Sequence, residues 1–193
     1  FKVTWIGFWF NIPGVTADPT QVAQSFFDTG HDVIISGIDT TEAVVVARQK
    51  RQAGKPVWAV PYDYIGACEG GDDICLGVPY FNWGPGYLDM IKSALDGKWA
   101  SRWEWLGPDW TNINNPDTSS VGFAVGPALS GETKKALDQF TADLGSDKIQ
   151  LFKGPLNYQD GSVFLKDGEK ATDQQIWYLK QLLEGMDGQS SAK

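Results

Sequence analysis

The first half of the chain contains four apolar runs, and each run ends in a short group of aromatic and hydrogen-bonding residues. The runs cover residues 3–10, 32–37, 56–61 and 76–81. Their terminal groups are Phe8-Trp9-Phe10-Asn11, Asp39-Thr40-Thr41, Tyr62-Asp63-Tyr64 and Tyr80-Phe81-Asn82-Trp83. Short apolar runs bounded by turn-forming residues are typical of buried strands. We therefore predict four strands, with the polar chemistry of this half of the chain at their ends.

Segments with helical spacing follow three of these strands. Asp18 and Pro19 form a helix start, and the predicted helix ends at about residue 28, before Gly30. Thr40 or Thr41 is expected to cap a second helix that extends to residue 52, and a third helix is expected over residues 86–96. Alternation of strands and helices predicts an α/β fold with three layers, α/β/α, and a mainly parallel sheet. Because parallel strands share one carboxyl edge, we expect the four terminal groups to converge on one crevice.

The second half of the chain has a looser pattern. Residues 100–120 are rich in turn-forming residues and predict a loop. Strands are expected over residues 121–125 and 149–153, a helix over 131–144, and a hairpin over 154–165. Thr172 and Gln175 form a capping box for a last helix that is expected to continue through Leu183.

Length and charge limit the classes of function. The 193 residues fit a single lobe, with its core in residues 1–120 and C-terminal segments in residues 121–193. Acidic residues outnumber basic ones by 24 to 16, so the chain repels phosphate backbones and no nucleic acid is expected as a partner. No apolar run approaches the roughly 20 residues of a membrane-spanning helix.

Cysteine and histidine are scarce in this sequence. Cys68 and Cys75 lie in one short loop, and the sequence leaves both a bridged and an unbridged pair open. A metal site formed with Asp72 and Asp73 would lack histidine and a second cysteine pair, so neither a metal nor another cofactor is expected. His31, the single histidine, precedes the second strand, and this position predicts a structural role away from the crevice.

The predicted crevice combines flat rings with a few hydrogen-bonding groups. The candidate ligand-binding residues are Phe8, Trp9, Phe10, Asp39, Asp63, Asn82 and Trp83. Tyr62 and Tyr64 flank Asp63 and offer apolar walls around one acceptor, which suits a flat, polar ligand. Asp39 and Asp63 also form the type of carboxylate pair that glycosidases use, so a nucleoside- or glycoside-processing hydrolase is an alternative. No catalytic residue is assigned, since the nucleophile-elbow and zinc-helix patterns are absent.

Eight short segments occur in an order that points to a known family. They are Trp5-Ile-Gly-Phe-Trp-Phe, Asp18-Pro19, Gly30-His-Asp-Val-Ile, Tyr62-Asp63, Phe81-Asn-Trp-Gly-Pro, Asp96-Gly-Lys-Trp, Gly154-Pro155 and Gln159-Asp-Gly. Together they resemble the basic membrane protein family, also called the purine nucleoside receptor type. Its members are substrate-binding lipoproteins of ABC importers. The resemblance implies a fold similar to type I periplasmic binding proteins and a binding function without enzymatic activity.

The resemblance also implies a ligand and roles for particular residues. The ligand would be a purine nucleoside or nucleobase held between two lobes. Trp9 or Phe10 would stack on the base, and Asp63 would bind ribose hydroxyls. Receptors of this family carry a lysine near the end of the fourth strand, where this chain has Asn82 and Trp83. A base without ribose is therefore an alternative ligand.

Family members are considerably longer than this chain. The resemblance assigns residues 1–193 to the second lobe and the C-terminal segments, with a first lobe and a lipid-bearing cysteine expected before residue 1. It implies an extracytoplasmic lipoprotein that contacts the membrane only through that anchor and delivers its ligand to the membrane subunits of an importer. A sensory or interaction domain of the same fold is a further alternative, in which the aromatic cluster contacts a protein.

Overall fold

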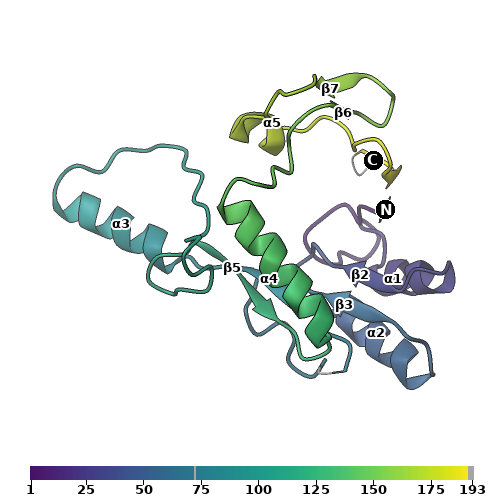
Figure 1. The fold of residues 1–193 in the computed structure, drawn as a ribbon. Coiled ribbons are helices and arrows are strands. Elements are labelled where there is room, and N and C mark those ends of the chain that lie inside the picture. Colours follow the sequence, from purple (N-terminus) through teal and green to yellow (C-terminus); the bar gives the residue numbers. More distant parts are fainter. Residues whose placement is uncertain (72, 191–193) are drawn as a thin grey trace.

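A computed structural model describes residues 1–71 and 73–190. In chain order the elements are β1 (Lys2–Val3), α1 (Pro19–Asp28), β2 (Val33–Ile35), α2 (Glu42–Gln52), β3 (Trp58–Val60), β4 (Gly77–Phe81), α3 (Gly84–Leu95), β5 (Val121–Val125), α4 (Gly131–Gly145), β6 (Leu156–Asn157), β7 (Val163–Leu165), α5 (Asp173–Trp177) and β8 (Asp187–Gly188) (Figure 1). Strands and helices alternate, and the predicted α/β class is confirmed.

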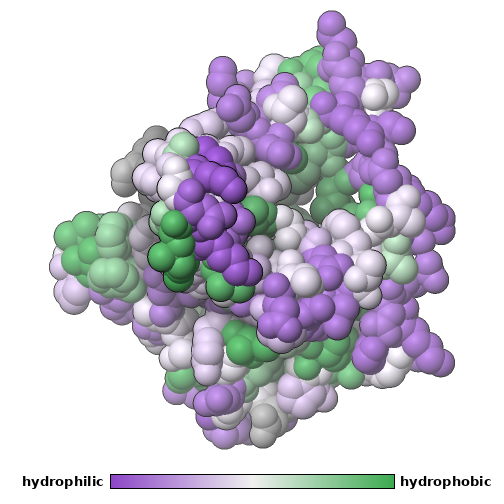
Figure 2. Space-filling view, turned by 90° about the vertical axis from the view of Figure 1, so that its left-hand side faces the viewer, coloured by the Kyte–Doolittle hydropathy of each residue, from purple (hydrophilic) through white to green (hydrophobic). Residues whose placement is uncertain are grey.

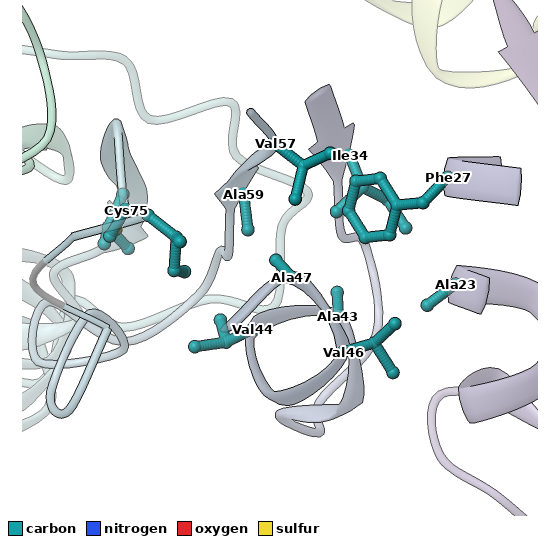
Figure 3. Packing of buried hydrophobic residues seen from close by; sticks show 12 residues of the cluster. Ala23, Phe27, Ile34, Ala43, Val44, Val46, Ala47, Val57, Ala59 and Cys75 are labelled. Atoms are coloured by element: carbon teal, nitrogen blue, oxygen red, sulfur yellow. The ribbon is translucent and has the colours of Figure 1, made fainter. Parts of the chain in front are cut away.

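The core lies where α1 and α2 pack on β2 and β3. Asp18 caps α1 as predicted, because its Oδ1 accepts hydrogen bonds from the Thr20 and Gln21 amides at 2.8 and 3.3 Å. Phe27 of α1 and Val46 of α2 are buried together with Ala59 of β3 (Figure 3). Burial of these apolar groups fixes the first half of the chain and thereby the positions of its strand ends.

The sheet is built from two-stranded pieces. β2 and β3 pair in parallel, with Ile34 opposite Ala59. β4 joins β3 only through isolated parallel bridges, Ala59 to Cys75 and Asp63 to Tyr80. Pro61 follows β3 directly and has no N–H, so it cannot continue the ladder between these bridges. The expected parallel arrangement is therefore present from β2 to β4, with an interruption at the proline.

The pairing of β4 with β5 is antiparallel. Phe81 lies opposite Val121, and Tyr80 lies opposite Gly122. The chain leaves β4 at residue 82 and returns at residue 120. At this point the backbone N–H of Asn82 donates to the Ser120 carbonyl at 2.8 Å. Because this excursion starts and ends at the same point, β5 runs back along β4. The parallel direction expected for most of the sheet does not extend to this strand.

The C-terminal segments differ from the sequence-based prediction at two places. The strand predicted over residues 149–153 is absent from the described structure except for a bridge from Lys153 to Lys170. The last helix ends at Trp177, because the following segment pairs with the β6–β7 hairpin instead: the Gln159 amide donates to the Leu182 carbonyl at 2.8 Å. The predicted hairpin and the Thr172–Gln175 capping box are both present.

Helices α3 and α4 bury none of their residues. Leu88, Ile91 and Leu95 of α3 are all more than half exposed, and Figure 2 shows apolar residues interspersed with hydrophilic ones on the face where α3 lies. The packed helical layer consequently consists of α1 and α2. Across the described ranges, no helix combines the length and the apolar character needed to cross a membrane.

Candidate ligand-binding site

The structure brings the four terminal groups together along one edge. The strand predicted over residues 3–10 is wrong, however, since only β1 (Lys2–Val3) is a strand there and it pairs with β8, while residues 7–10 form a bent loop. The Asp39 amide donates to the Trp9 carbonyl at 2.8 Å, which joins the first two terminal groups. The Tyr62 hydroxyl donates to Asp39 Oδ1 at 2.9 Å and so joins the second group to the third. The Tyr62 and Phe81 rings meet edge to face with centroids 6.4 Å apart. The four terminal groups are thus linked by direct contacts in chain order.

The candidate rings differ in how far they are already engaged with one another. Phe8 and Phe10 form an edge-to-face pair with centroids 4.9 Å apart. Trp9 is 59% exposed and takes part in none of the aromatic pairs among the described residues. Trp83 is 61% exposed, but it stacks on Tyr87 with centroids 6.2 Å apart and also lies against the Phe81 ring with centroids 5.5 Å apart. Trp9 therefore presents the freest aromatic surface at this edge, and Trp83 is exposed but held between two rings.

Asp63 occupies an unusual backbone conformation between β3 and β4. Its φ is +77°, and its amide donates to the Pro79 carbonyl while its own carbonyl accepts from Phe81, both at 3.0 Å. Aspartate is among the few non-glycine residues that tolerate this region. Within the described part of the chain, its carboxylate accepts no hydrogen bond. The backbone is therefore fixed at two points while the side-chain acceptor stays available.

Asp39 is engaged with Tyr62. Partial burial of the Tyr62 ring, the hydrogen bond to Asp39 and the charges of Asp39 and Asp63 together raise the pKa of the Tyr62 hydroxyl to about 12, and burial has the largest effect. Tyr62 consequently remains protonated and holds one oxygen of the Asp39 carboxylate. Of the two candidate carboxylates, Asp63 is the one whose oxygens both accept no hydrogen bond from the described residues.

A cavity of about 550 Å³ opens beside Asp63. It is lined by Asp63, Tyr64, Ile65, Tyr80, Phe81, Asn82, Trp83, Asn114 and Pro116. Three of the candidate residues, Asp63, Asn82 and Trp83, contribute to this lining, whereas Phe8, Trp9, Phe10 and Asp39 lie outside it. The edge therefore contains a recess at the ends of β3 and β4 and an exposed aromatic loop at the end of the first apolar run.

Asn82 lines this cavity, but its side chain is held by protein groups. Its Nδ2 donates to the carbonyls of Pro116 and Ser119 at 2.8 and 2.7 Å, and its Oδ1 accepts from the Gly84 amide at 3.3 Å. Both donors and the acceptor of the amide are thereby used. The structure thus gives Asn82 a local role that the sequence pattern does not indicate.

Residues 109–119 form a part of the site that sequence reasoning misses. This segment, called the Asn-rich loop below, supplies Asn114 and Pro116 to the cavity. Asn114 Oδ1 accepts from the Tyr80 hydroxyl at 3.0 Å and its Nδ2 donates to the Phe123 carbonyl at 3.0 Å. The sequence marks the segment as a loop through its Asn, Asp, Ser and Thr content, but nothing in that content indicates which strand the loop will meet.

The remaining polar candidates lie away from this cavity. Cys68 and Cys75 are joined by a disulfide bond, while Asp72 lies outside the described residues. Over the ranges that the structure describes, no cluster of three or more His, Cys, Asp and Glu side chains is placed to hold a metal ion. His31 precedes β2, and its Nδ1 lies 3.1 Å from the Phe26 carbonyl oxygen.

Comparison with known proteins identifies relatives of this chain. No protein-family model matches it. The chain is 32% identical over 186 residues to a purine-binding protein of Brucella abortus, and the match covers 96% of this chain and 48% of the relative. This chain is a relative of that protein. The family resemblance seen in its sequence is thereby confirmed.

Other proteins are also similar to this chain. It is 27% identical to a protein of Haloferax volcanii named as an ABC transporter glucose-binding protein, over 98% of this chain and 41% of that relative. A solved solute-binding protein of an ABC transporter system from Conexibacter woesei aligns with a TM-score of 0.44 and 13% identity, over 68% of this chain and 41% of its own. The chain thus spans about half the length of the curated relatives it matches.

Proposed function

We propose that this chain is part of the substrate-binding component of an ABC importer and binds a purine nucleobase or nucleoside. The observation that carries the proposal is the similarity to a purine-binding protein along 96% of the chain. The cavity beside Asp63 supports it, because its volume of about 550 Å³ falls in the range of small-molecule sites.

The proposed chemistry matches a purine in two respects. A purine presents a flat face to aromatic rings, and a base that stacks on such a ring gains about 1–3 kcal/mol in nucleic-acid-binding proteins. Trp83 offers that surface inside the cavity and Trp9 offers it at the neighbouring loop. Asp63 supplies an acceptor for a ring N–H, an exocyclic amine or a ribose hydroxyl.

The importer assignment carries proposals on location and partners. We propose that the protein acts outside the cytoplasm, that a lipid group outside these 193 residues attaches it to the membrane, and that the importer's membrane subunits receive its ligand. The same assignment implies binding without turnover. A hydrolase that uses Asp39 and Asp63 is less well supported, since Asp39 already accepts the Tyr62 hydroxyl. Both curated relatives are named as binding proteins.

The experiment is a titration of the purified protein, in the form that its gene encodes, with adenine, adenosine and D-glucose by isothermal calorimetry. The proposal expects saturable binding of a purine and an unchanged ligand by chromatography after incubation. Preference for glucose would show that the protein is a sugar-binding protein, as the relative from Haloferax volcanii is named. Release of free base from adenosine would show that it is a hydrolase. Failure to bind any of the three would favour the interaction-domain alternative.

Two matched variants locate the site in the same titration. Trp83→Ala removes a ring that lines the cavity, whereas Trp99→Ala removes an equally large and similarly exposed ring elsewhere. We expect the first variant to weaken purine binding at least tenfold and the second to leave it unchanged. Equal effects of the two variants would place the ligand outside the described cavity.

A further inference from the structure

One side chain links the end of β4 to the Asn-rich loop. The Asn82 amide group donates to the carbonyls of Pro116 and Ser119 at 2.8 and 2.7 Å, and both acceptors belong to that loop. Intramolecular hydrogen bonds of this kind are net favourable, so the loop and the strand end stabilise each other. Asn82 thereby sets where Pro116, which lines the cavity, lies relative to Trp83.

The Asn-rich loop is shaped by its own side chains at the other end. Asp109 accepts hydrogen bonds from the amide and the hydroxyl of Thr111 at 2.9 and 2.6 Å, and from the hydroxyl of Thr118. These bonds lower the pKa of Asp109 to about 2, with those from the two threonine side chains having the largest effect. Ser119 is buried and its Oγ accepts from the Asp109 amide at 2.9 Å. The loop therefore has a defined shape before any ligand enters.

This shape determines one boundary of the cavity. Asp63, Tyr64 and Ile65 line it from the connection after β3, and Asn114 and Pro116 line it from the Asn-rich loop. A displacement of the loop changes the width available to a ligand without altering the rings or the carboxylate. If the Asn-rich loop moves away from the cavity, a small ligand loses its contacts with the loop, whereas a larger ligand can still reach it.

We infer that Asn82 is a positioning residue that holds the Asn-rich loop as a wall of the ligand cavity, and that this wall sets the preference between a bare purine base and a larger nucleoside. The inference rests on the proposed function. It replaces donation from the Asn82 side chain to the ligand, because Nδ2 already donates to two carbonyls of the loop.

Two variants loosen the loop by different routes. Asn82→Asp keeps the acceptor for the Gly84 amide but replaces the donor to two carbonyls with an oxygen. Asp109→Asn weakens the turn from inside the loop and changes no residue of the cavity lining. Asp117→Asn is the matched control, since among the described residues the Asp117 carboxylate accepts no hydrogen bond and the same chemical change occurs in the same loop.

The experiment measures dissociation constants for adenine and adenosine, together with hydrogen exchange of residues 109–119, in the protein as its gene encodes it. For Asn82→Asp and Asp109→Asn we expect faster exchange in the loop and at least a fivefold shift of preference towards adenosine. Asp117→Asn should match the wild type in both measurements. If Asn82→Asp does not fold, the comparison of Asp109→Asn with Asp117→Asn decides the question.

Two results would overturn the inference. Faster exchange in the Asp109→Asn loop without a change of preference would show that the loop does not set ligand choice. A change of preference in Asn82→Asp with unchanged exchange would show direct contact with the ligand instead. Both differ from failure of the proposed function, which appears as a wild-type protein that binds neither adenine nor adenosine.

Discussion

The hydroxyl of Tyr62 donates a hydrogen bond to Oδ1 of Asp39 across 2.9 Å, and this contact ties the end of β3 to the segment that follows β2. Burial of the ring, the bond to Asp39 and the neighbouring carboxylate charges raise the pKa of Tyr62 to about 12 from its ordinary value of 10.0. A raised pKa means that the protonated tyrosine stabilises the fold. That contribution is complete below pH 10 and is lost as the pH rises to about 12.

We therefore expect the wild-type protein to lose stability relative to Tyr62→Phe between about pH 10 and pH 12. Urea unfolding at several pH values measures the difference, and ultraviolet difference titration of the two proteins isolates the single hydroxyl. Asp39→Asn should lower the pKa of Tyr62, since it removes the charged acceptor but leaves the ring partly buried. An unchanged titration in Asp39→Asn would contradict the assigned contact.

Asp63→Asn tests the free carboxylate beside the cavity. Asparagine tolerates the positive φ of +77° at this position, so the backbone bridge to β4 should persist. We expect ribose-bearing ligands to bind more weakly by about 1.5–3 kcal/mol, the value of a hydrogen bond to a charged group, and free bases to be affected less. Calorimetric titration with adenosine and adenine measures both effects. An equal loss for the two ligands would mean that Asp63 contacts the base.

Trp9→Ala and Phe10→Ala should separate into a binding and a stability effect. Trp9 is largely exposed, whereas Phe10 packs on the Phe8 ring. If Trp9 stacks on the ligand, its removal should weaken adenine and adenosine alike by about 1–3 kcal/mol. Phe10→Ala should instead lower the melting temperature. Thermal denaturation and ligand titrations of both variants separate the stability effect from the binding effect. Weaker binding in Phe10→Ala with a lower melting temperature in Trp9→Ala would identify Phe10 as the stacking ring.

The disulfide between Cys68 and Cys75 should contribute modestly to stability. It closes a short loop, and the loss of chain entropy in the unfolded state corresponds to at most about 2.5 kcal/mol. We expect the Cys68→Ala and Cys75→Ala double variant to unfold at a lower urea concentration, and the reduced wild type to behave similarly. Alanine is chosen because Cys75 is fully buried and tolerates no unpaired hydroxyl. Unchanged unfolding would show that the bridge is not formed in solution.

Local sequence chemistry predicts the parts of the fold that depend on neighbouring residues. The Asp18 cap and the Thr172–Gln175 box need only three or four consecutive residues, and both are present where the sequence places them. The second helix is the counterexample: the sequence offers Thr40 or Thr41 as its cap, and α2 begins after Thr41 without a side-chain hydrogen bond to the helix start. The apolar runs likewise predict β2, β3 and β4, because burial of such runs does not depend on their pairing partner.

Features that depend on distant residues are not predicted. The end of the last helix at Trp177 follows from pairing of Leu182 with Gln159, which no local pattern indicates. The Asn-rich loop reaches the cavity through Asn82 and Tyr80, more than 30 residues earlier in the chain. Of the candidate residues, Asp63, Asn82 and Trp83 are brought to one cavity, and their roles in binding stay predictions.

Gly122 lies opposite Tyr80 in the β4–β5 pair, and a Cβ at this position would overlap the tyrosine ring. Any larger residue there would displace the ring and its hydroxyl, which donates to Asn114 in the Asn-rich loop. Gly122 itself is not part of the cavity lining. A substitution at this one sheet position would therefore change the shape of the cavity while every residue that lines it keeps its identity.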